Sequence, residues 1–506
     1  MRGPSRLCSK NGTFFFRYSS SNEQPKCPSL LDLCIHRITE EMHNYNTFSS
    51  LPRDLTQQIF NTLVYTCCLT PVSFQAFRDC SLEDLYLGEY AGAVVNDGWM
   101  DVISSQGLSL LHVDLSGTDF TDQGLACLRD CKNTISLNLN YCHQISDCGL
   151  EYISGLSNLE SLSFRRNAAI SAQGLSNISG LSNLVKLDLE RCPRIHGGIA
   201  HLQGLSKLES LNMNCCNCLT DVDMKPLSDL TNLKRLEISC NKVTDFGISF
   251  LKGLRKLALL NLEGCLVTAE CLDSLAELPA LSYLNLSRCN LSNNGCENFS
   301  RLENLNVLNL GFNGITDACL AHLKGLTKLK SLNLDSCWID GEGLVHLAGH
   351  QHLSCLNLSD TYVGTNGLQH LSGLTGLTDL DLFGARITDF GTNYLRNFKN
   401  LRSLEICGGE LTDDGARNIK ELSSLTCLNL SQNCNLTDTT LELISGLTGL
   451  ISLNVSNSRI TNTGLQHLKT LKNLRFLSLE SCKVTANDIK KLQTTYLPNL
   501  VSFRPE

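Results

Sequence analysis

A leucine that returns every 24 residues constrains the fold of this chain more than any other feature. The clearest copies stand 24 residues apart, at Leu284, Leu308, Leu332, Leu356, Leu380, Leu404 and Leu428. The register extends back to Leu85 and forward to Leu477 at intervals of 24 or 25, apart from a longer first step, so that the chain holds 17 units. Phe503 takes the same place in a final partial unit. Repetition at such a period predicts a stack of similar units.

Each unit carries a strand signal followed by a helix signal. The consensus is L-x-x-L-x-L-x-x-(C/N)-x-(I/V/L)-T-D-x-G-L-x-x-L, and the copy that begins at Leu305 shows it clearly. The Leu-x-Leu alternation has the period of a strand with one buried face, and the later Leu-x-x-Leu has the period of a helix. A Thr-Asp or Ser-Asp pair before the helix, such as Thr244-Asp245, supplies an N-cap and a negative first turn.

Units of this size have to stack in order to be stable. One unit offers about seven buried apolar side chains at roughly 1.5–3 kcal/mol each, whereas ordering its backbone costs roughly 1–2 kcal/mol per residue. Neighbouring units must therefore share buried faces. Because strands stack about 4.8 Å apart and helices about 10 Å apart, we expect the strands to form the inner, concave surface.

The ninth position of the unit, at the turn that leaves the strand, holds asparagine or cysteine in most copies. The residues are Asn167, Asn241, Asn313 and Asn433, and Cys142, Cys192, Cys216, Cys265, Cys289, Cys337 and Cys482. An inward asparagine can bond the backbone of adjacent turns, and a cysteine there is expected to be a small, buried, weak donor. Because the 26 cysteines follow the repeat and have no spacing of a secreted disulfide framework, we expect reduced thiols and a cytoplasmic or nuclear location.

The pattern resembles that of the leucine-rich-repeat family over roughly residues 82–503. The resemblance implies an α/β fold, a horseshoe solenoid with a parallel concave sheet and convex helices. Residues 137–150, with Cys142 at the ninth position and Ile145-Ser-Asp-Cys-Gly-Leu150 after it, are similar to the cysteine-containing class of repeats. That class is common in F-box/leucine-rich-repeat substrate receptors of ubiquitin ligases, and the overall likeness is to plant intracellular proteins of F-box-like type.

Three parts are expected along the chain: a flexible tail at 1–50, a helical N-terminal cap at 51–81, and a solenoid of about 17 units at 82–506. The cap resembles the opening of an F-box, which implies contact with a ligase adaptor through Leu51, Pro52, Leu55, Ile59, Phe60 and Leu63. The tryptophan expected late in an F-box is missing, and most units are shorter than the usual cysteine-containing repeat. A degenerate F-box and a plain capping helix are both consistent with these residues.

Several function classes find no support in the sequence. The net charge of −8 does not favour a duplex nucleic acid as partner, and no stretch approaches the roughly 20 apolar residues of a membrane span. No P-loop, G-x-S-x-G or H-E-x-x-H motif is present. His322, His346 and His370 would lie on separate helices about 8–10 Å apart, too far to share one ion. We therefore expect no catalysis, no cofactor and no metal.

Binding another macromolecule, most simply a protein, is the function that this shape favours. Side chains between the strand leucines are expected on the concave face, where arginines and aromatic rings are typical interface anchors. The candidates are Arg165, Arg166, Lys186, Arg191, Lys234, Arg235, Tyr283, Arg288, Phe312 and Phe383. Substrate recognition for an SCF-type ubiquitin ligase is a specific version of this hypothesis. The alternative is a secreted or receptor-type ectodomain that senses a ligand and carries disulfides.

Overall fold

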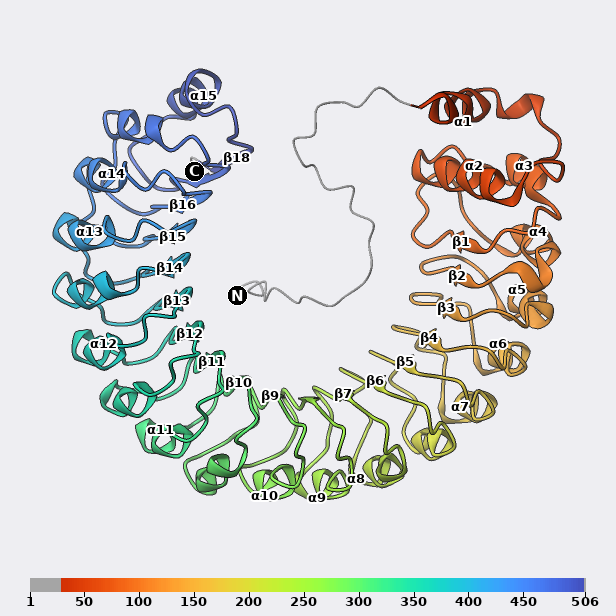
Figure 1. Cartoon of the computed structure of the whole chain (residues 1–506), viewed down its shortest axis with the longest axis horizontal. Coiled ribbons are helices and arrows are strands. Elements are labelled where there is room, and N and C mark those ends of the chain that lie inside the picture. The colour runs from red at the N-terminus through yellow and green to blue at the C-terminus, as the bar shows by residue number, and fades with distance from the viewer. Residues whose placement is uncertain (1–28, 505–506) are drawn as a thin grey trace.

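The repeat units form one continuous open arc in a computed structural model, which describes residues 29–504 (Figure 1). Strands line the inner edge of the arc and helices lie along its outer edge, so the predicted horseshoe solenoid is confirmed. Over the described residues the sheet has 18 strands, and each strand pairs in parallel with its neighbour in the sequence.

Every strand is three residues long and is centred on the repeated leucine or its replacement. The bounds are β1 Asp84–Tyr86, β2 His112–Asp114, β3 Ser136–Asn138, β4 Ser161–Ser163, β5 Lys186–Asp188, β6 Ser210–Asn212, β7 Arg235–Glu237, β8 Leu259–Asn261, β9 Tyr283–Asn285, β10 Val307–Asn309, β11 Ser331–Asn333, β12 Cys355–Asn357, β13 Asp379–Asp381, β14 Ser403–Glu405, β15 Cys427–Asn429, β16 Ser452–Asn454, β17 Phe476–Ser478 and β18 Ser502–Arg504. Leu85 lies opposite Val113 and Leu477 opposite Phe503, so the alignment of the repeats is also the register of the strands.

The helices of the outer edge are short, mostly one or two turns. The α-helices are α1 Leu30–Glu40, α2 Arg53–Tyr65, α3 Pro71–Phe74, α4 Met100–Ser105, α5 Asp122–Leu125, α6 Asp147–Ile153, α7 Ala172–Asn177, α8 Asp221–Met224, α9 Asp245–Ser249, α10 Cys271–Leu275, α11 Asp317–Leu323, α12 Thr365–Leu371, α13 Asp413–Ile419, α14 Asp438–Ile444 and α15 Ala486–Thr495. Short 3₁₀ helices lie at Met42–Asn44, Gln75–Phe77, Asp97–Trp99, Gly107–Ser109, Ala126–Asp130, Gly198–Leu202, Lys225–Asp229, Cys296–Arg301, Glu342–Leu347, Gly391–Asn397 and Gly464–Thr470. Between residues 29 and 504, none of the helices has the length and apolar character needed to cross a bilayer.

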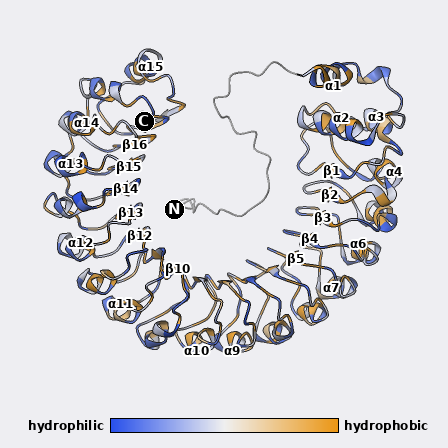
Figure 2. Cartoon of the chain, in the orientation of Figure 1, coloured by the Kyte–Doolittle hydropathy of each residue, from blue (hydrophilic) through white to orange (hydrophobic). Residues whose placement is uncertain are grey.

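The core is a ribbon that runs along the arc and has no single centre. The side chains at the strand centres are at most 2% exposed from Leu85 to Leu477, and hydrophobic positions recur in every coil (Figure 2). Each coil therefore buries its leucines against the coils before and after it, as the stacking argument requires.

The ladder of ninth-position side chains is confirmed. Asn313 donates from Nδ2 to the carbonyls of Leu286 in the preceding coil and Leu310 in its own, both at 2.8 Å, and its Oδ1 accepts from the N–H groups of Cys289 and Leu291. Cys337 makes a weaker version of the same contact, from Sγ to the carbonyl of Leu310 at 3.2 Å. These side chains satisfy turn carbonyls that the sheet does not reach.

A second ladder, on the outer side of the arc, explains the T-D-x-G motif. Asp122 in α5 accepts hydrogen bonds from the N–H (2.7 Å) and the hydroxyl (2.6 Å) of Ser146, which caps α6 in the next coil. A Cβ on Gly149 would lie 2.4 Å from Asp122 Oδ1, closer than atoms can approach. The same relation holds for Asp147, Ser171 and Gly174, and for Asp221, Thr244 and Gly247. The carboxylate of one coil therefore requires the glycine of the next.

The N-terminal cap is larger than the sequence analysis expects. The expected division into a tail at 1–50 and a cap at 51–81 places the start of the cap too late, because α1 already packs beside α2 and buries Ile35. Residues 1–28 of the expected tail lie outside the described part of the chain. α1 buries only this one side chain, and its leucines at 30, 31 and 33 remain exposed. Aromatic rings fill the cap above the first coil, with the ring centres of Phe48 and Phe60 at 5.1 and 5.5 Å from that of Phe77, and Phe74 at 5.2 Å from Trp99.

Candidate concave binding surface

The structure places the candidate residues in three rows on the inner side of the arc, with one exception. Lys186, Arg235 and Tyr283 belong to the strands, one residue before the central leucine. Lys234 precedes its strand and is the exception. The others lie in the turn that leaves the strand: Arg165 and Phe383 three residues after the central leucine, and Arg166, Arg191, Arg288 and Phe312 four residues after it. We call this last position, from Glu89 to Ser481 in the 17 full units, the turn row.

Every residue of the turn row has a left-handed backbone, with φ between 48° and 70°. This conformation points the backbone N–H at the next coil: Arg166 donates to Glu190 O at 2.8 Å and Phe312 to Asp335 O at 2.7 Å. Glycine adopts such a backbone freely, whereas other residues are strained by about 1–3 kcal/mol. Gly264 and Gly384 show that the position accepts glycine. Each bulky side chain in the turn row is therefore present despite the backbone strain of a non-glycine residue.

Side chains of the turn row stack on one another along the arc. The Arg166 guanidinium lies 5.2 Å from the ring centre of Tyr141 in the preceding coil, and that of Arg288 lies 3.7 Å from the ring centre of Phe312 in the next. Such cation–π contacts hold a flexible arginine in one place. The sequence analysis missed Tyr141, although its spacing of 25 residues from Arg166 places it in the same row.

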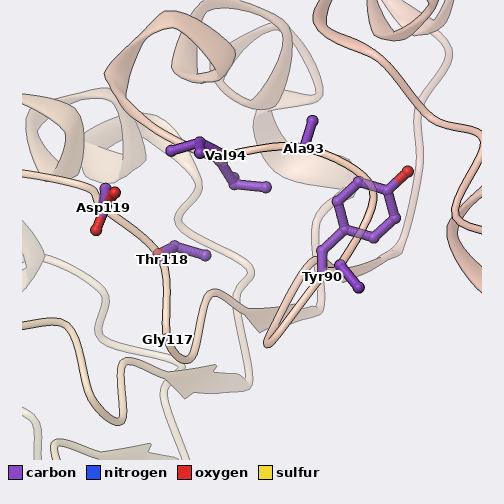
Figure 3. Close-up of a pocket in the computed structure, with 8 residues that line it drawn as sticks. Tyr90, Ala93, Val94, Gly117, Thr118 and Asp119 are labelled. Atoms are coloured by element: carbon purple, nitrogen blue, oxygen red, sulfur yellow. The ribbon is translucent and has the colours of Figure 1, made fainter.

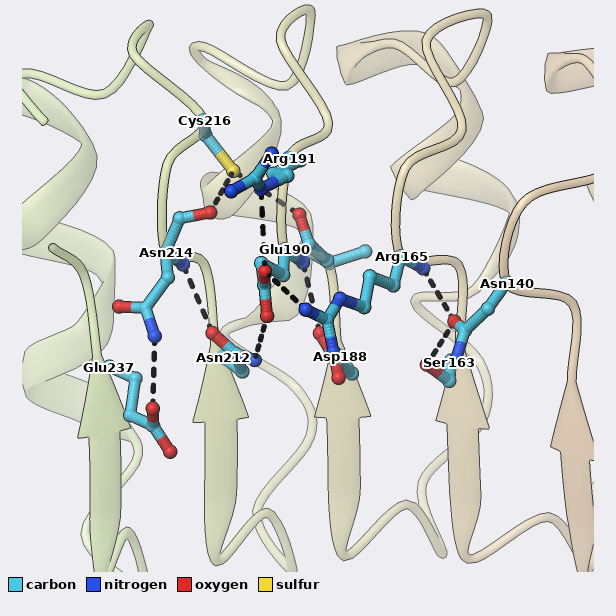
Figure 4. A network of polar contacts seen from close by, with 11 residues as sticks. Asn140, Ser163, Arg165, Asp188, Glu190, Arg191, Asn212, Asn214, Cys216 and Glu237 are labelled. Carbon is cyan, nitrogen blue, oxygen red and sulfur yellow. Dashed lines mark hydrogen bonds and ion pairs between the residues drawn. The ribbon is translucent and has the colours of Figure 1, made fainter. Parts of the chain in front are cut away.

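Acidic side chains pair with most of the basic candidates, and Figure 4 shows the pairs that Glu190 makes with Arg165 and Arg191. Arg165 Nη2 lies 2.7 Å from Glu190 Oε1, and Arg191 Nε lies 3.5 Å from the same oxygen. Arg235 and Lys234 pair with Glu237 at 3.3 Å and Glu209 at 2.8 Å. Amides continue the network, since Asn212 donates to Glu190 and Asn214 to Glu237. The surface is thus a mixed, ordered network and not a free basic patch.

Burial changes the acidity of groups within this network. It raises the pKa of Asp188 to about 6, against a weaker opposing effect of the Glu190 N–H that the carboxylate accepts from. Burial, with Glu237 and Glu263 nearby, also raises the pKa of Tyr283. The Nε atoms of Arg165 and Arg166 are buried and have no hydrogen-bond acceptor within the described residues.

The second half of the inner surface is acidic, which the sequence analysis did not anticipate. Asp335, Asp360, Asp379, Asp381 and Glu405 lie on four consecutive coils, and within residues 29–504 no ion pair links any of them to a cation. Burial and the neighbouring carboxylates raise the pKa of Asp335 and of Glu405. At the strand position before the central leucine and at the two turn positions, the concave surface therefore carries its cations before residue 290 and an unpaired run of carboxylates after residue 330.

The F-box-like residues divide into buried and accessible groups. Ile59, Phe60 and Leu63 are at most 1% exposed and hold the cap together. Leu51 and Pro52 are exposed and Leu55 is half-buried at the start of α2. In this conformation, contact with an adaptor is open only to Leu51, Pro52 and Leu55.

Elsewhere the described residues offer little for chemistry. A hollow of about 330 Å³ lies beside the second coil and is lined by Tyr90, Val94, Thr118 and Asp119 among others (Figure 3). The Tyr90 hydroxyl already donates a hydrogen bond to Leu69 O at 2.7 Å. No group of three His, Cys, Asp or Glu side chains in the described chain could hold a metal ion. The 24 cysteines between residues 29 and 504 are free thiols.

Comparisons with known proteins agree with this architecture. A leucine-rich repeat region model matches residues 247–506, and shorter leucine-rich repeat models match residues 202–267 and 108–128. Among solved structures, an internalin of Listeria monocytogenes is 27% identical, with a TM-score of 0.52, over 66% of this chain and 93% of its own. A leucine-rich repeat protein of Leptospira interrogans is 23% identical, with a TM-score of 0.57, over 77% and 94%.

No curated protein matches the sequence. Because the leucine-rich repeat region model matches residues 247–506, more than half of the 506 residues, the chain belongs to the leucine-rich-repeat proteins.

Proposed function

We propose that the chain is a non-enzymatic scaffold that binds another protein along its concave surface. The observation that carries this proposal is the turn row. Between Tyr141 and Phe312 it holds three arginines and two aromatic rings in a strained backbone conformation, at a position where glycine would cost nothing. The fold needs the left-handed backbone of this row but not these side chains, and arginines and aromatic rings dominate binding energy at interfaces.

The charge distribution defines the kind of partner surface that fits. Arginines of the first half favour acidic or aromatic groups on the partner, and the unpaired carboxylates from Asp335 to Glu405 favour basic groups. A partner with both kinds of charge would lie along the arc in one orientation only. We place this interaction in the cytoplasm or nucleus.

Affinity capture from the source cells tests the proposal, with the partner quantified by mass spectrometry. The concave variant R166E/R288E removes two arginines that stack on aromatic rings in the turn row. The matched control R129E/R386E removes two arginines that stack on Tyr152 and Tyr362 outside the turn row. We expect at least a tenfold loss of partner for the first variant and little loss for the second. Equal capture by both variants would contradict a concave binding site.

A finer proposal is that the bound protein is a substrate and that the cap docks the adaptor of an SCF-type ubiquitin ligase. The exposed start of α2 supports it, because Leu51, Pro52 and Leu55 are accessible there. Pull-down of the adaptor by the full chain should be lost in L51D/L55D and retained in V72D. Val72 is 82% exposed on the same cap, so V72D is a matched surface control. Absence of adaptor from the wild-type pull-down would remove this version and leave the scaffold proposal intact.

A further inference from the structure

Cysteines occupy two different positions in the coils of this protein. Those at the ninth position donate to backbone carbonyls, as Cys216 does to Leu189 O at 3.2 Å, and all of them except the half-buried Cys482 are buried. The turn row carries cysteine in only two of its 17 positions, Cys215 and Cys240, and these belong to consecutive coils. The two residues have no part in the ninth-position ladder, so the architecture alone does not explain them.

Strand register places the two turn-row cysteines side by side. Ser210 of β6 lies opposite Arg235 of β7, and each cysteine follows five residues later with the same backbone, at φ of 56° and 55°. The N–H of Cys215 donates to Ser239 O at 2.7 Å, which ties the two turns together. Parallel neighbours stand about 4.8 Å apart, within the roughly 4.4–6.8 Å between Cα atoms that a disulfide spans.

The two thiols lie on neighbouring coils and are open to solvent. Cys215 is, after burial, the first neighbouring group that raises the pKa of the Cys240 thiol, and Cys240 is exposed while Cys215 is half-buried. Cys296 and Cys319 are a second pair of thiols that shift each other's pKa, but both are completely buried in the core. A soluble oxidant can therefore reach the first pair and not the second.

We propose that Cys215 and Cys240 form an oxidisable dithiol, a modification site on the concave surface that a hydroperoxide converts to a disulfide. The Cys240 thiolate attacks one peroxide oxygen, which gives a sulfenic acid and, after protonation of the leaving hydroxide, one water. The Cys215 thiolate then attacks the sulfenic sulfur, the S–S bond forms and a second water leaves. Two thiols and one hydrogen peroxide thus yield one disulfide and two waters.

The surroundings of the pair make the reaction dependent on pH. Burial, with Cys215 and Glu263 nearby, raises the pKa of the Cys240 thiol. The thiolate is then a minor species at neutral pH, and the oxidation rate should rise as the solution becomes alkaline. The pair is therefore slow to oxidise under mild conditions and stays a dithiol in a reducing compartment.

The position of the pair gives the modification a consequence for binding. Cys215 and Cys240 follow Arg191 in the turn row and precede Arg288, so a disulfide would fix the middle of the proposed partner surface and remove two thiols from it. This consequence rests on the proposed function, whereas the chemistry of the pair does not. A partner that binds elsewhere would leave the oxidation unchanged.

The test uses full-length, fully reduced protein exposed to hydrogen peroxide and then alkylated. Thiols are counted in denaturant, and non-reduced peptides are mapped with fragmentation that separates Cys215 from Cys216 and Cys218. We expect the wild type to lose two thiols and to give a peptide pair linked through Cys215 and Cys240. C215S and C240S should both lack this linked pair. C427S, which removes another exposed cysteine, should behave like the wild type.

Two results would overturn the inference. One is a wild-type disulfide that maps to other cysteines, or no linked pair at a peroxide concentration that oxidises an unfolded reference. The other is loss of two thiols in C240S at the wild-type rate. Because the measurement needs no partner, its outcome is independent of whether the concave surface binds a protein.

Discussion

Replacing Gly149 by alanine should destabilise the protein, although helix propensity alone predicts the opposite. Gly149 lies within α6, where alanine is normally more stable than glycine by about 1 kcal/mol. The added Cβ would sit 2.4 Å from Asp122 Oδ1 and 3.1 Å from Leu125 Cδ1. Asp122 cannot move away freely, because its carboxylate holds the N–H and the hydroxyl of Ser146.

The magnitude follows from the bonds that must break. A hydrogen bond to a charged group is worth about 1.5–3 kcal/mol, so displacing the carboxylate costs about 3–6 kcal/mol and the helix gain offsets about 1. We expect the free energy of unfolding of G149A, measured by urea denaturation with circular dichroism, to fall by about 2–5 kcal/mol. Gly180 provides the control, since a Cβ added there would have no atom within 4 Å, and G180A should be neutral or slightly stabilising.

A double variant isolates the cause. D122A alone should be destabilised because it loses the same two bonds to Ser146. In that background the carboxylate is gone, so adding G149A should no longer destabilise and should recover up to about 1 kcal/mol of helix propensity. An additive double variant, or a G149A protein as stable as the wild type, would refute the explanation of the T-D-x-G motif.

Three further outcomes follow from the same structure. Burial raises the pKa of Asp188 from 3.8 to about 6, so the protonated side chain contributes stability below pH 4 that is lost as the pH rises through 6. D188N should therefore have a higher melting temperature than the wild type at pH 7.5 and the same melting temperature at pH 4. N313A should lower the free energy of unfolding by about 2–4 kcal/mol in urea titrations, whereas N313C should lose less, since a cysteine can still donate to the carbonyl of the preceding coil. If residues before 51 belong to the cap, F48A should lower the free energy of unfolding by about 3–5 kcal/mol, which calorimetry would detect as a lower melting temperature. An unchanged melting temperature would argue against a cap that begins before residue 51.

The fold could be predicted from the sequence because one residue type fixes the register of every coil. Leu284 and Leu308 are aligned in the sequence by their spacing and in the sheet by their pairing, so no long-range information was needed. The inward asparagines could be assigned for a similar reason, since a polar residue at a buried turn has only backbone groups to bond. α1 escaped prediction because its packing depends on the cap, and most of its leucines remain exposed while Ile35 alone is buried.

The candidate surface was only partly predictable, because its chemistry lies between coils. Arg165 and Glu190 are 25 residues apart, and only stacking brings them to 2.7 Å. The pairing of the basic candidates with acidic side chains therefore became visible only in the structure, and the acidic run from Asp335 to Glu405 was overlooked. Reading the same position down successive units would have revealed Tyr141 beside Arg166 and Cys215 beside Cys240. The left-handed backbone of that row has no signal in a single unit, since most of its residues are not glycine.

Hydroxyl-radical footprinting of the protein with and without its captured partner tests the concave binding site most directly. The account predicts that the partner protects the inner-surface aromatics Tyr283 and Phe312, and leaves the outer-surface Phe246 and Phe390 as reactive as in the free chain. Protection of Phe246 and Phe390 with Tyr283 and Phe312 unchanged would place the partner on the helices and contradict the account.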